Sequence, residues 1–233
     1  MKIVTLEGVI KSVTPLSDTA REVVIAFQEP FESLPGSFVN FFMDVAGTST
    51  RRAYSVVATD AVEKTLTLSI RKSLTGTMTP EFWKDDIVGR KVRIMGPMGL
   101  NTADKLAKPT LHLVAYGIGC GVIRAIAEFA VHAPFIQKIT ITTGSRNEND
   151  ILYKSYFDAL ALAHPHVSVR YVISDPKDPT YPYKGYAQDH IDDYDFNNSD
   201  VYMCGQEKAC NSLIEKIKSR NPEGVTYFIE AFH

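Results

Sequence analysis

The residues best suited to chemistry are Arg52, Tyr54 and Ser55 in the first half of the chain and the glycines of residues 117–121 in the second half. On an extended strand, Arg52 and Tyr54 point to one face and Ser55 to the other. The guanidinium can then pair with a pyrophosphate while the phenol lies against a planar ring, and Ser55 can donate a hydrogen bond. Taken alone, this tetrapeptide fits an ordinary edge strand better. The order of the two stretches nevertheless predicts two nucleotide-like ligands.

The second stretch, Gly117-Ile118-Gly119-Cys120-Gly121, follows a strand-like run and precedes a helix-like one. This is the position where a parallel sheet binds a pyrophosphate against a helix N-terminus. Its spacing differs from the Gly-x-Gly-x-x-Gly dinucleotide fingerprint. Cys204-Gly205-Gln206 ends another strand-like run, where ligands also gather. The competing interpretation of Cys204 is a small buried hydrophobe before a turn.

The elements that position Arg52, Tyr54 and Ser55 are short, alternating or β-branched runs separated by Pro, Gly, Asp and Ser. Six such runs predict a six-stranded antiparallel Greek-key β-barrel at residues 3–13, 22–28, 37–45, 52–58, 65–71 and 91–95. Residues 77–83 predict one capping helix, with Thr79 as N-cap and Pro80 in the first position. Its start suits a second diphosphate contact, although a capped surface helix explains the same residues.

From residue 110 onward, strand and helix patterns alternate, which predicts a parallel sheet covered by helices. The predicted strands are residues 110–115, 138–143, 168–173, 200–204 and 225–229, and the predicted helices are residues 122–131, 151–163 and 207–220. The change of pattern lies near residues 101–109. We therefore expect a barrel domain at residues 1–105 and an α/β nucleotide-binding domain at residues 106–233.

The composition is that of a soluble globular protein, with 233 residues, 45% hydrophobic residues, 22% charged residues and a formal net charge of -2. This near-neutral balance predicts neither nucleic-acid binding nor membrane attraction. The longest apolar run, residues 111–123, is too short and too rich in glycine to insert in a membrane. The three cysteines and the histidines show neither disulfide nor metal spacing, so we expect no metal and a reducing cytoplasm.

Taken in chain order, these motifs resemble those of the ferredoxin–NADP reductase family of flavoproteins. The matching motifs are Pro35-Gly36, Arg52-Ala53-Tyr54-Ser55, Gly76 to Thr79, Gly96-Pro97-Met98-Gly99, Gly117 to Gly121, Cys204-Gly205-Gln206 and Glu230-Ala231-Phe232. They cover nearly the whole chain. The chain departs from the family pattern at Ile118, where threonine is usual, and at Val122 and Gln206, where proline is usual.

The resemblance implies that the barrel binds FAD, with FMN as an alternative. Arg52 would bind the flavin phosphate, Tyr54 would stack on the isoalloxazine, and Ser55 would contact the ring near N5. The remaining residues expected on the flavin side are Ile70, Arg71, Lys72, Gly76, Thr77, Met78 and Thr79.

For the second domain, the resemblance implies a site for NAD(P)H. The residues expected to bind this nucleotide are Gly117, Ile118, Gly119, Cys120, Ser145, Arg146, Ser174, Asp175, Gly205 and Gln206. Cys204 would lie beside nicotinamide C4, and Phe232 would cover the flavin face. Glu230 and Ser55 would assist proton movement, which makes Ser55, Cys204 and Glu230 the catalytic candidates.

The preferred nucleotide depends on two pairs of residues that each follow a strand. Asp175, after Ser174, would repel a 2′-phosphate and could accept a bond from a free 2′-hydroxyl. Arg146, after Ser145, could bind that phosphate but is equally explained as a solvated loop charge. We expect NADH to be favoured over NADPH.

The function expected from the resemblance is an NAD(P)H-dependent flavoprotein oxidoreductase that passes electrons to a separate acceptor, such as ferredoxin, flavodoxin or an oxygenase component. The chain has no cysteine quartet for an iron–sulfur cluster, so a one-electron centre would lie on another protein or subunit. Two alternatives are an electron-transfer subunit of a larger iron–sulfur or haem complex and a non-catalytic nucleotide-sensing module.

Overall fold

The structure of the chain is a computed structural model that describes residues 2–73 and 75–232. The chain divides into two compact units between Asp104 and Lys105, one residue before the predicted boundary. Each unit has its own sheet.

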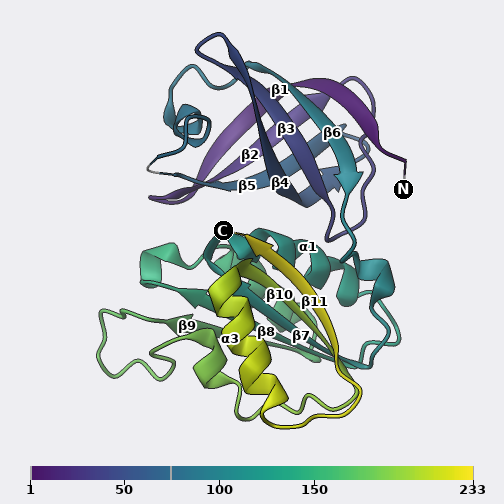
Figure 1. The fold of residues 1–233 in the computed structure, drawn as a ribbon, viewed down its shortest axis with the longest axis vertical. Coiled ribbons are helices and arrows are strands. Elements are labelled where there is room, and N and C mark those ends of the chain that lie inside the picture. The colour runs from purple at the N-terminus through teal and green to yellow at the C-terminus, as the bar shows by residue number, and fades with distance from the viewer. Residues whose placement is uncertain (1, 74, 233) are drawn as a thin grey trace. The chain divides into compact units, whose positions relative to one another are not determined.

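The first unit is a closed six-stranded antiparallel barrel with the strand order β1-β2-β5-β4-β3-β6 (Figure 1). Strands β3, β4 and β5 pair in sequence and β2 pairs with β5, which is a Greek-key arrangement. The strands are β1 (Val4–Ser17), β2 (Ala20–Phe27), β3 (Phe38–Val45), β4 (Thr48–Asp60), β5 (Thr65–Arg71) and β6 (Lys91–Met98). The predicted fold of this unit is confirmed, and β1 and β4 are longer than their alternating runs indicated.

The barrel closes around apolar side chains that alternate along its strands. On β5, Leu66, Leu68 and Ile70 are fully buried, whereas Thr67 and Ser69 between them are partly exposed. This period of two places one face of each strand in the core. The turn before β3 needs glycine, because Gly36 has a φ of 89°.

The predicted capping helix is shorter and begins differently than expected. It is a 3-10 helix, η1 (Thr79–Trp83), that starts at Thr79, and the preceding Met78 makes no side-chain cap. The Thr79 hydroxyl instead accepts a hydrogen bond from the backbone N–H of Ser73, at 2.9 Å. The prediction of Thr79 as N-cap is therefore wrong, because a nearer loop donor takes its side-chain oxygen.

The second unit is a five-stranded sheet that is parallel, as predicted, and its strand order is β11-β10-β7-β8-β9 (Figure 1). Its strands are β7 (Thr110–Tyr116), β8 (Lys138–Ser145), β9 (Val167–Ile173), β10 (Ser199–Gln206) and β11 (Thr226–Phe232). Its helices are α1 (Cys120–Ala130), α2 (Lys154–Ala163) and α3 (Glu207–Lys218). Short 3-10 turns are η2 (Ala103–Lys105), η3 (Gly117–Gly119), η4 (Glu148–Asp150) and η5 (Ala187–His190). The boundary between the two units falls within η2.

The strand order reverses direction beside β7. The chain runs from β7 through β8 to β9 on one side, then returns to β10 and β11 on the other. Because parallel crossovers are right-handed, α1 and α3 cover opposite faces of the sheet. A reversal of this kind opens a crevice at the carboxyl ends of the strands, which is where open α/β sheets bind ligands.

Helix α2 starts later than its sequence pattern indicated. Tyr153 adopts the left-handed conformation, with a φ of 57°, and the α-helix begins at the next residue. Just before the predicted helix, residues 148–150 form the 3-10 turn η4. Among the described residues, no helix has the length and apolar character needed to cross a bilayer.

Candidate functional site

In the barrel, the candidate residues meet around Tyr54 on β4. Its ring is half-buried and packs edge-on against Phe41, with 5.8 Å between centroids. Its hydroxyl donates to Sδ of Met78 at 3.7 Å, so strand β4 contacts the segment that leads into η1. Burial raises the pKa of Tyr54 well above its usual range, against an opposing effect of Arg52. Tyr54 is therefore a neutral phenol with one aromatic face packed in the barrel.

Arg52 lies two residues before Tyr54 and is exposed. One of its guanidinium nitrogens, Nη1, donates to the carbonyl of Arg51 at 2.7 Å. A guanidinium has five N–H donors, so most of them are available to an anion. Ser55 is half-buried and pairs in register with Phe38 on β3.

The loop after β5 is a compact turn built on Ser73. Its hydroxyl accepts hydrogen bonds from the backbone N–H groups of Gly76 (2.9 Å) and Thr75 (3.4 Å). A Cβ added at Gly76 would lie 3.0 Å from Cβ and Oγ of Ser73, so the turn leaves little room for a side chain there. Thr77 is exposed and Thr79 half-buried. Their hydroxyl protons are chemically suited to a phosphate oxygen.

The three predicted flavin-side residues at the end of β5 have different surroundings. Ile70 is fully buried in the barrel core and its backbone pairs with Arg21, so its side chain is a core residue. Arg71 and Lys72 are exposed. Because strand alternation sends Ile70 inward, only the two cations can reach a ligand with their side chains.

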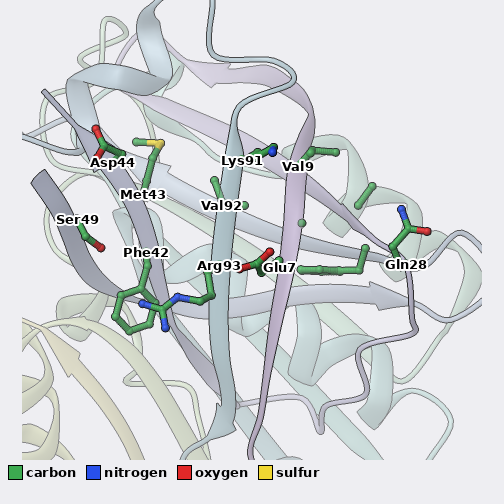
Figure 2. A pocket seen from close by; sticks show the side chains of 13 residues that line it. Glu7, Val9, Gln28, Phe42, Met43, Asp44, Ser49, Lys91, Val92 and Arg93 are labelled. Atoms are coloured by element: carbon green, nitrogen blue, oxygen red, sulfur yellow. The ribbon is translucent and has the colours of Figure 1, made fainter. Parts of the chain in front are cut away.

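One groove on the barrel contains none of the predicted residues. Figure 2 shows this groove, a cavity of about 410 Å³ over β1, β3 and β6. It is lined by charged side chains such as Glu7 and Lys91 and by Arg93, whose guanidinium lies 4.2 Å from the ring centroid of Phe42. The size of a cavity therefore does not identify the candidate site here.

In the sheet unit, every predicted segment lies at the carboxyl end of a parallel strand. Residues 117–121 follow β7, Ser145 and Arg146 end β8 and begin the next loop, and Ser174 and Asp175 follow β9. Cys204 to Gln206 end β10, and Glu230 to Phe232 end β11. The parallel register brings these segments to one edge of the sheet.

Two glycines make the closest approach at this edge, where β7 and β10 are neighbours. A Cβ added at Gly119 would lie 2.2 Å from the carbonyl oxygen of Cys204. A Cβ added at Gly205, whose φ is 156°, would lie 2.5 Å from Cβ of Tyr116. Only glycine permits this backbone contact. The turn after β7 and the end of β10 are thus fixed against each other.

Cys204 is buried and pairs in register with Glu230 on β11. Burial, with a further contribution from the charge of Glu230, raises the pKa of the Cys204 thiol well above its usual range. The thiol therefore stays protonated and is not poised as a nucleophile. Glu230 is half-buried and Phe232 is 37% exposed.

The two residues expected to decide nucleotide preference are neighbours. The backbone N–H of Asp175 donates to the carbonyl of Arg146 at 2.8 Å, and the N–H of Ser174 donates to the carbonyl of Ser145 at 3.0 Å. Both Arg146 and Asp175 are exposed. The sequence did not reveal that their opposite charges lie on adjacent backbone segments.

One contact in this region was not predicted from the sequence. Glu148 Oε1 accepts a hydrogen bond from the backbone N–H of Lys177 at 2.8 Å, which joins the loops after β8 and β9. The acidic run in which it lies resembles an ordinary surface loop, so no sequence signal identified it.

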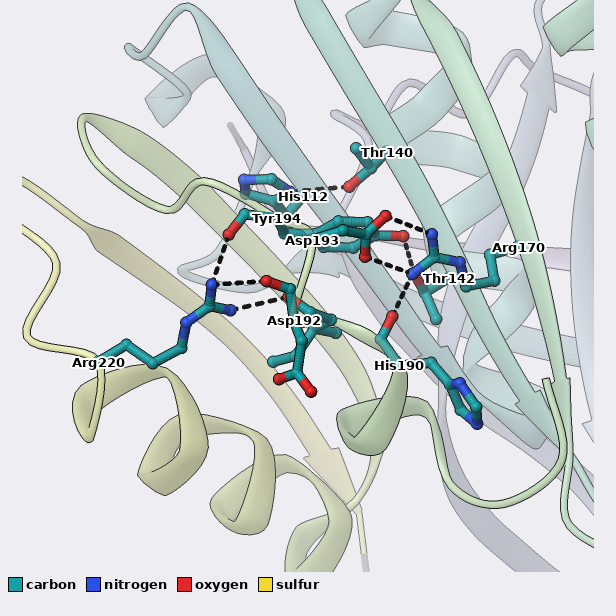
Figure 3. A network of polar contacts seen from close by, with 10 residues as sticks. His112, Thr140, Thr142, Arg170, His190, Asp192, Asp193, Tyr194 and Arg220 are labelled. Carbon is teal, nitrogen blue, oxygen red and sulfur yellow. Dashed lines mark hydrogen bonds and ion pairs between the residues drawn. The ribbon is translucent and has the colours of Figure 1, made fainter. Parts of the chain in front are cut away.

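The contacts that hold the long connection between β9 and β10 were not predicted from the sequence either. Figure 3 shows how two arginines hold it: Arg170 donates to both carboxylate oxygens of Asp193, and Arg220 donates to the carbonyls of Ile191, Asp192 and Tyr194. His112 on β7 contacts the same connection through the carbonyl of Asp195. These contacts order the segment without contributing to the candidate site.

No group of three or more His, Cys, Asp or Glu within residues 2–73 and 75–232 has the geometry to hold a metal ion. Cys120, Cys204 and Cys210 are buried and form no disulfide.

Comparison with known protein families matches both units. Residues 6–102 match the oxidoreductase FAD-binding domain, and residues 113–213 match the oxidoreductase NAD-binding domain. The two matches follow the order of the barrel and the sheet along the chain.

Two curated proteins illustrate the similarity. Ferredoxin–NADP reductase B of Sorangium cellulosum (strain So ce56) is 26% identical over 187 residues, which are 79% of this chain and 76% of that protein. The reductase component DmpP of phenol 2-monooxygenase from Pseudomonas sp. (strain CF600) is 24% identical over 232 residues. That alignment covers 97% of this chain and 65% of DmpP, so the chain spans about two thirds of that relative.

Among solved structures, the Amycolatopsis cytochrome P450 reductase GcoB superposes with a TM-score of 0.84 at 23% identity. The superposition covers 99% of this chain and 71% of GcoB. At this identity the likeness concerns the fold.

Proposed function

The chain belongs to the ferredoxin reductase-like family of FAD- and NAD-binding oxidoreductases, and on this premise we propose that it oxidises NAD(P)H and passes electrons to a separate acceptor. When bound, the flavin accepts a hydride from the nicotinamide and releases electrons to that acceptor. The protein's own residues bind the flavin and the nicotinamide, orient them and exclude water.

The barrel residues fit FAD by their chemistry. Tyr54 offers a neutral aromatic ring, Arg52 an exposed cation, and Gly76 a turn that a Cβ would crowd. We assign flavin stacking to Tyr54, phosphate binding to Arg52, and diphosphate binding to Arg71, Lys72 and residues 76–79. Ser55 would donate to the flavin ring. Ile70 contributes to the core beneath these groups.

The sheet residues fit a nicotinamide dinucleotide by their backbone geometry. The contact between Gly119 and the Cys204 carbonyl is the observation that carries this assignment, because it shapes the crevice where the strand order reverses. The pyrophosphate would bind at Gly117, Ile118, Gly119 and Cys120, before α1. Cys204, with Gly205 and Gln206, would pack beside the nicotinamide as a neutral thiol, and Glu230 would serve proton movement, with Phe232 as the covering ring.

We propose NADH as the favoured donor. The backbone N–H of Asp175 is bonded to the carbonyl of Arg146, and in this proposal the aspartate charge would offset the cation that would otherwise attract a 2′-phosphate. Ser145 and Ser174 offer hydroxyls for the ribose.

The acceptor in this proposal is a redox protein or subunit separate from the chain. Two relatives support this proposal by their names, the reductase component DmpP of phenol 2-monooxygenase and the reductase subunit of an aromatic O-demethylase. The three buried cysteines, which form no disulfide, suit a reducing compartment, and we propose the cytoplasm.

The test is the visible spectrum of the protein loaded with FAD or FMN, repeated without oxygen after NADH or NADPH is added. We expect flavin bands that NADH bleaches faster than NADPH. Arg52→Ala should lose flavin on dialysis, whereas Arg51→Ala, a control on the opposite face of the same strand, should retain it. A protein that binds neither flavin would refute the proposal, and a bound flavin that neither nucleotide reduces would favour the partner-dependent subunit.

A further inference from the structure

Two cations, Arg21 and Lys72, lie over the ring of Trp83, and the assignments above give a role to Lys72 alone. The guanidinium carbon of Arg21 lies 5.2 Å from the centroid of the indole ring, and Nζ of Lys72 lies 5.3 Å from it. Arg21 comes from β2, Lys72 follows β5, and Trp83 ends η1. Three separate elements therefore converge on one ring.

Within residues 2–73 and 75–232, neither cation has an acidic partner. Among the residues that the structure describes, the charged group of Lys72 has no hydrogen bond or ion pair, and Nε of Arg21 is buried without a hydrogen-bond acceptor. Two other cations on the barrel, Lys84 and Arg90, both pair with Glu81 at 2.7 Å. Arg21 and Lys72 have only the ring of Trp83 as a favourable neighbour for their charges. An anion bound near them would be attracted by both charges.

The pair adjoins the turn assigned to the diphosphate. Lys72 directly precedes Ser73, whose N–H donates to the hydroxyl of Thr79, and Thr79 and Trp83 are the two ends of the five-residue η1. The backbone N–H of Lys72 also donates to the carbonyl of Thr19 at 2.8 Å, which ties this segment to the start of β2. Lys72 thus lies on the same short segment as Gly76 and Thr79, and Arg21 lies on the neighbouring strand β2, in register with Ile70.

We propose that Arg21 and Lys72, held by Trp83, form an anion subsite for the phosphate that FAD has and FMN lacks. The inference rests on the proposed flavin function and extends it, because it makes this subsite the determinant of FAD over FMN. Arg21 acts here through charge and N–H donation to that phosphate, and Trp83 positions both cations.

The experiment compares the affinities of wild type and Arg21→Gln for FAD and for FMN. We expect FAD to bind about 10- to 100-fold more weakly to Arg21→Gln, the loss of one charge-assisted hydrogen bond, with FMN changed less than about 3-fold. Arg21→Lys should recover much of the FAD affinity. The difference between the two proteins should narrow at high salt, since the interaction is ionic.

The matched control is Arg93→Gln, because Arg93 also lies over an aromatic ring on the barrel, that of Phe42. It should leave both affinities unchanged. Equal losses of FAD and FMN in Arg21→Gln would indicate a purely structural arginine and overturn the inference. Unchanged FAD affinity, or a wild type that prefers FMN, would overturn it while leaving the flavin function standing. A wild type that binds neither flavin would overturn both.

Discussion

His112 should make the sheet unit lose stability in mild acid. Its ring is fully buried between Tyr194 and Phe196, Nε2 lies 2.9 Å from the carbonyl oxygen of Asp195, and Nδ1 lies 2.8 Å from Oγ1 of Thr140. Because a carbonyl only accepts, Nε2 carries the hydrogen and Nδ1 accepts from threonine. Burial lowers the pKa of His112 from 6.5 to about 4, against a smaller opposing effect of the Asp195 carbonyl.

A pKa that is lower in the folded state than in the unfolded state stabilises the fold above the unfolded value. That contribution is therefore present above pH 6.5 and disappears as the pH falls toward about 4. A shift of this size corresponds to about 3 kcal/mol of unfolding free energy. Carboxylates with lowered pKa values, such as those of Asp193 and Asp195, add to acid sensitivity, but at lower pH.

The assay is urea unfolding, followed by far-UV circular dichroism, at several pH values between 7 and 4, with hydrogen exchange of β7 and β8 to localise the change. His112→Gln keeps a donor and an acceptor but cannot be protonated. We expect this variant to be less stable than wild type at pH 7, and its unfolding free energy should fall much less between pH 6.5 and 4. His132→Gln is the control, since the His132 side chain is 69% exposed. If wild type and His112→Gln lose stability in parallel over this interval, the reasoning is refuted.

Three further predictions concern the nucleotide edge of the sheet. Gly119→Ala should lower the unfolding free energy by about 1–3 kcal/mol in urea denaturation, because its Cβ would meet the Cys204 carbonyl; an unchanged midpoint at equal m-value would contradict this contact. Cys204→Ala should slow single-turnover flavin reduction by NADH while flavin affinity stays the same, and an unaltered rate would remove Cys204 from the catalytic candidates. Asp175→Asn should raise kcat/KM for NADPH relative to NADH by about 10-fold, the loss of one repulsive charge beside the 2′ position. Arg146→Gln should shift the same ratio the other way, and a ratio that neither variant moves would exclude this pair as the determinant.

Much of the fold could be predicted because its signals are local. Alternation with a period of two marked the barrel strands, and the change to alternating strands and helices marked the sheet. The candidate residues at the strand ends followed from motif order, since parallel strands bring their carboxyl ends to one edge. The position of Ile70 could have been read from the same alternation, which sends it inward with Leu66 and Leu68.

The features that the sequence did not predict depend on which of several possible partners a side chain contacts. The cap of η1 depended on whether the Thr79 hydroxyl would bond within its own helix or to Ser73, and both are chemically acceptable. The segment between β9 and β10 is held by contacts between residues far apart in the sequence. His112 and Asp195, for example, are 83 residues apart. A single sequence carries no pattern for such pairings.

The position of Trp83 gives the protein a built-in optical reporter. It is the chain's single tryptophan, and it packs against the barrel core. Indole emission therefore follows the barrel alone, whereas the circular dichroism of the helices follows the sheet unit, so the two units' unfolding can be separated without labels. A flavin bound at the proposed site would absorb that emission by energy transfer. Loading with FAD could then be followed by the quenching of one residue, even in variants that no longer react with NADH.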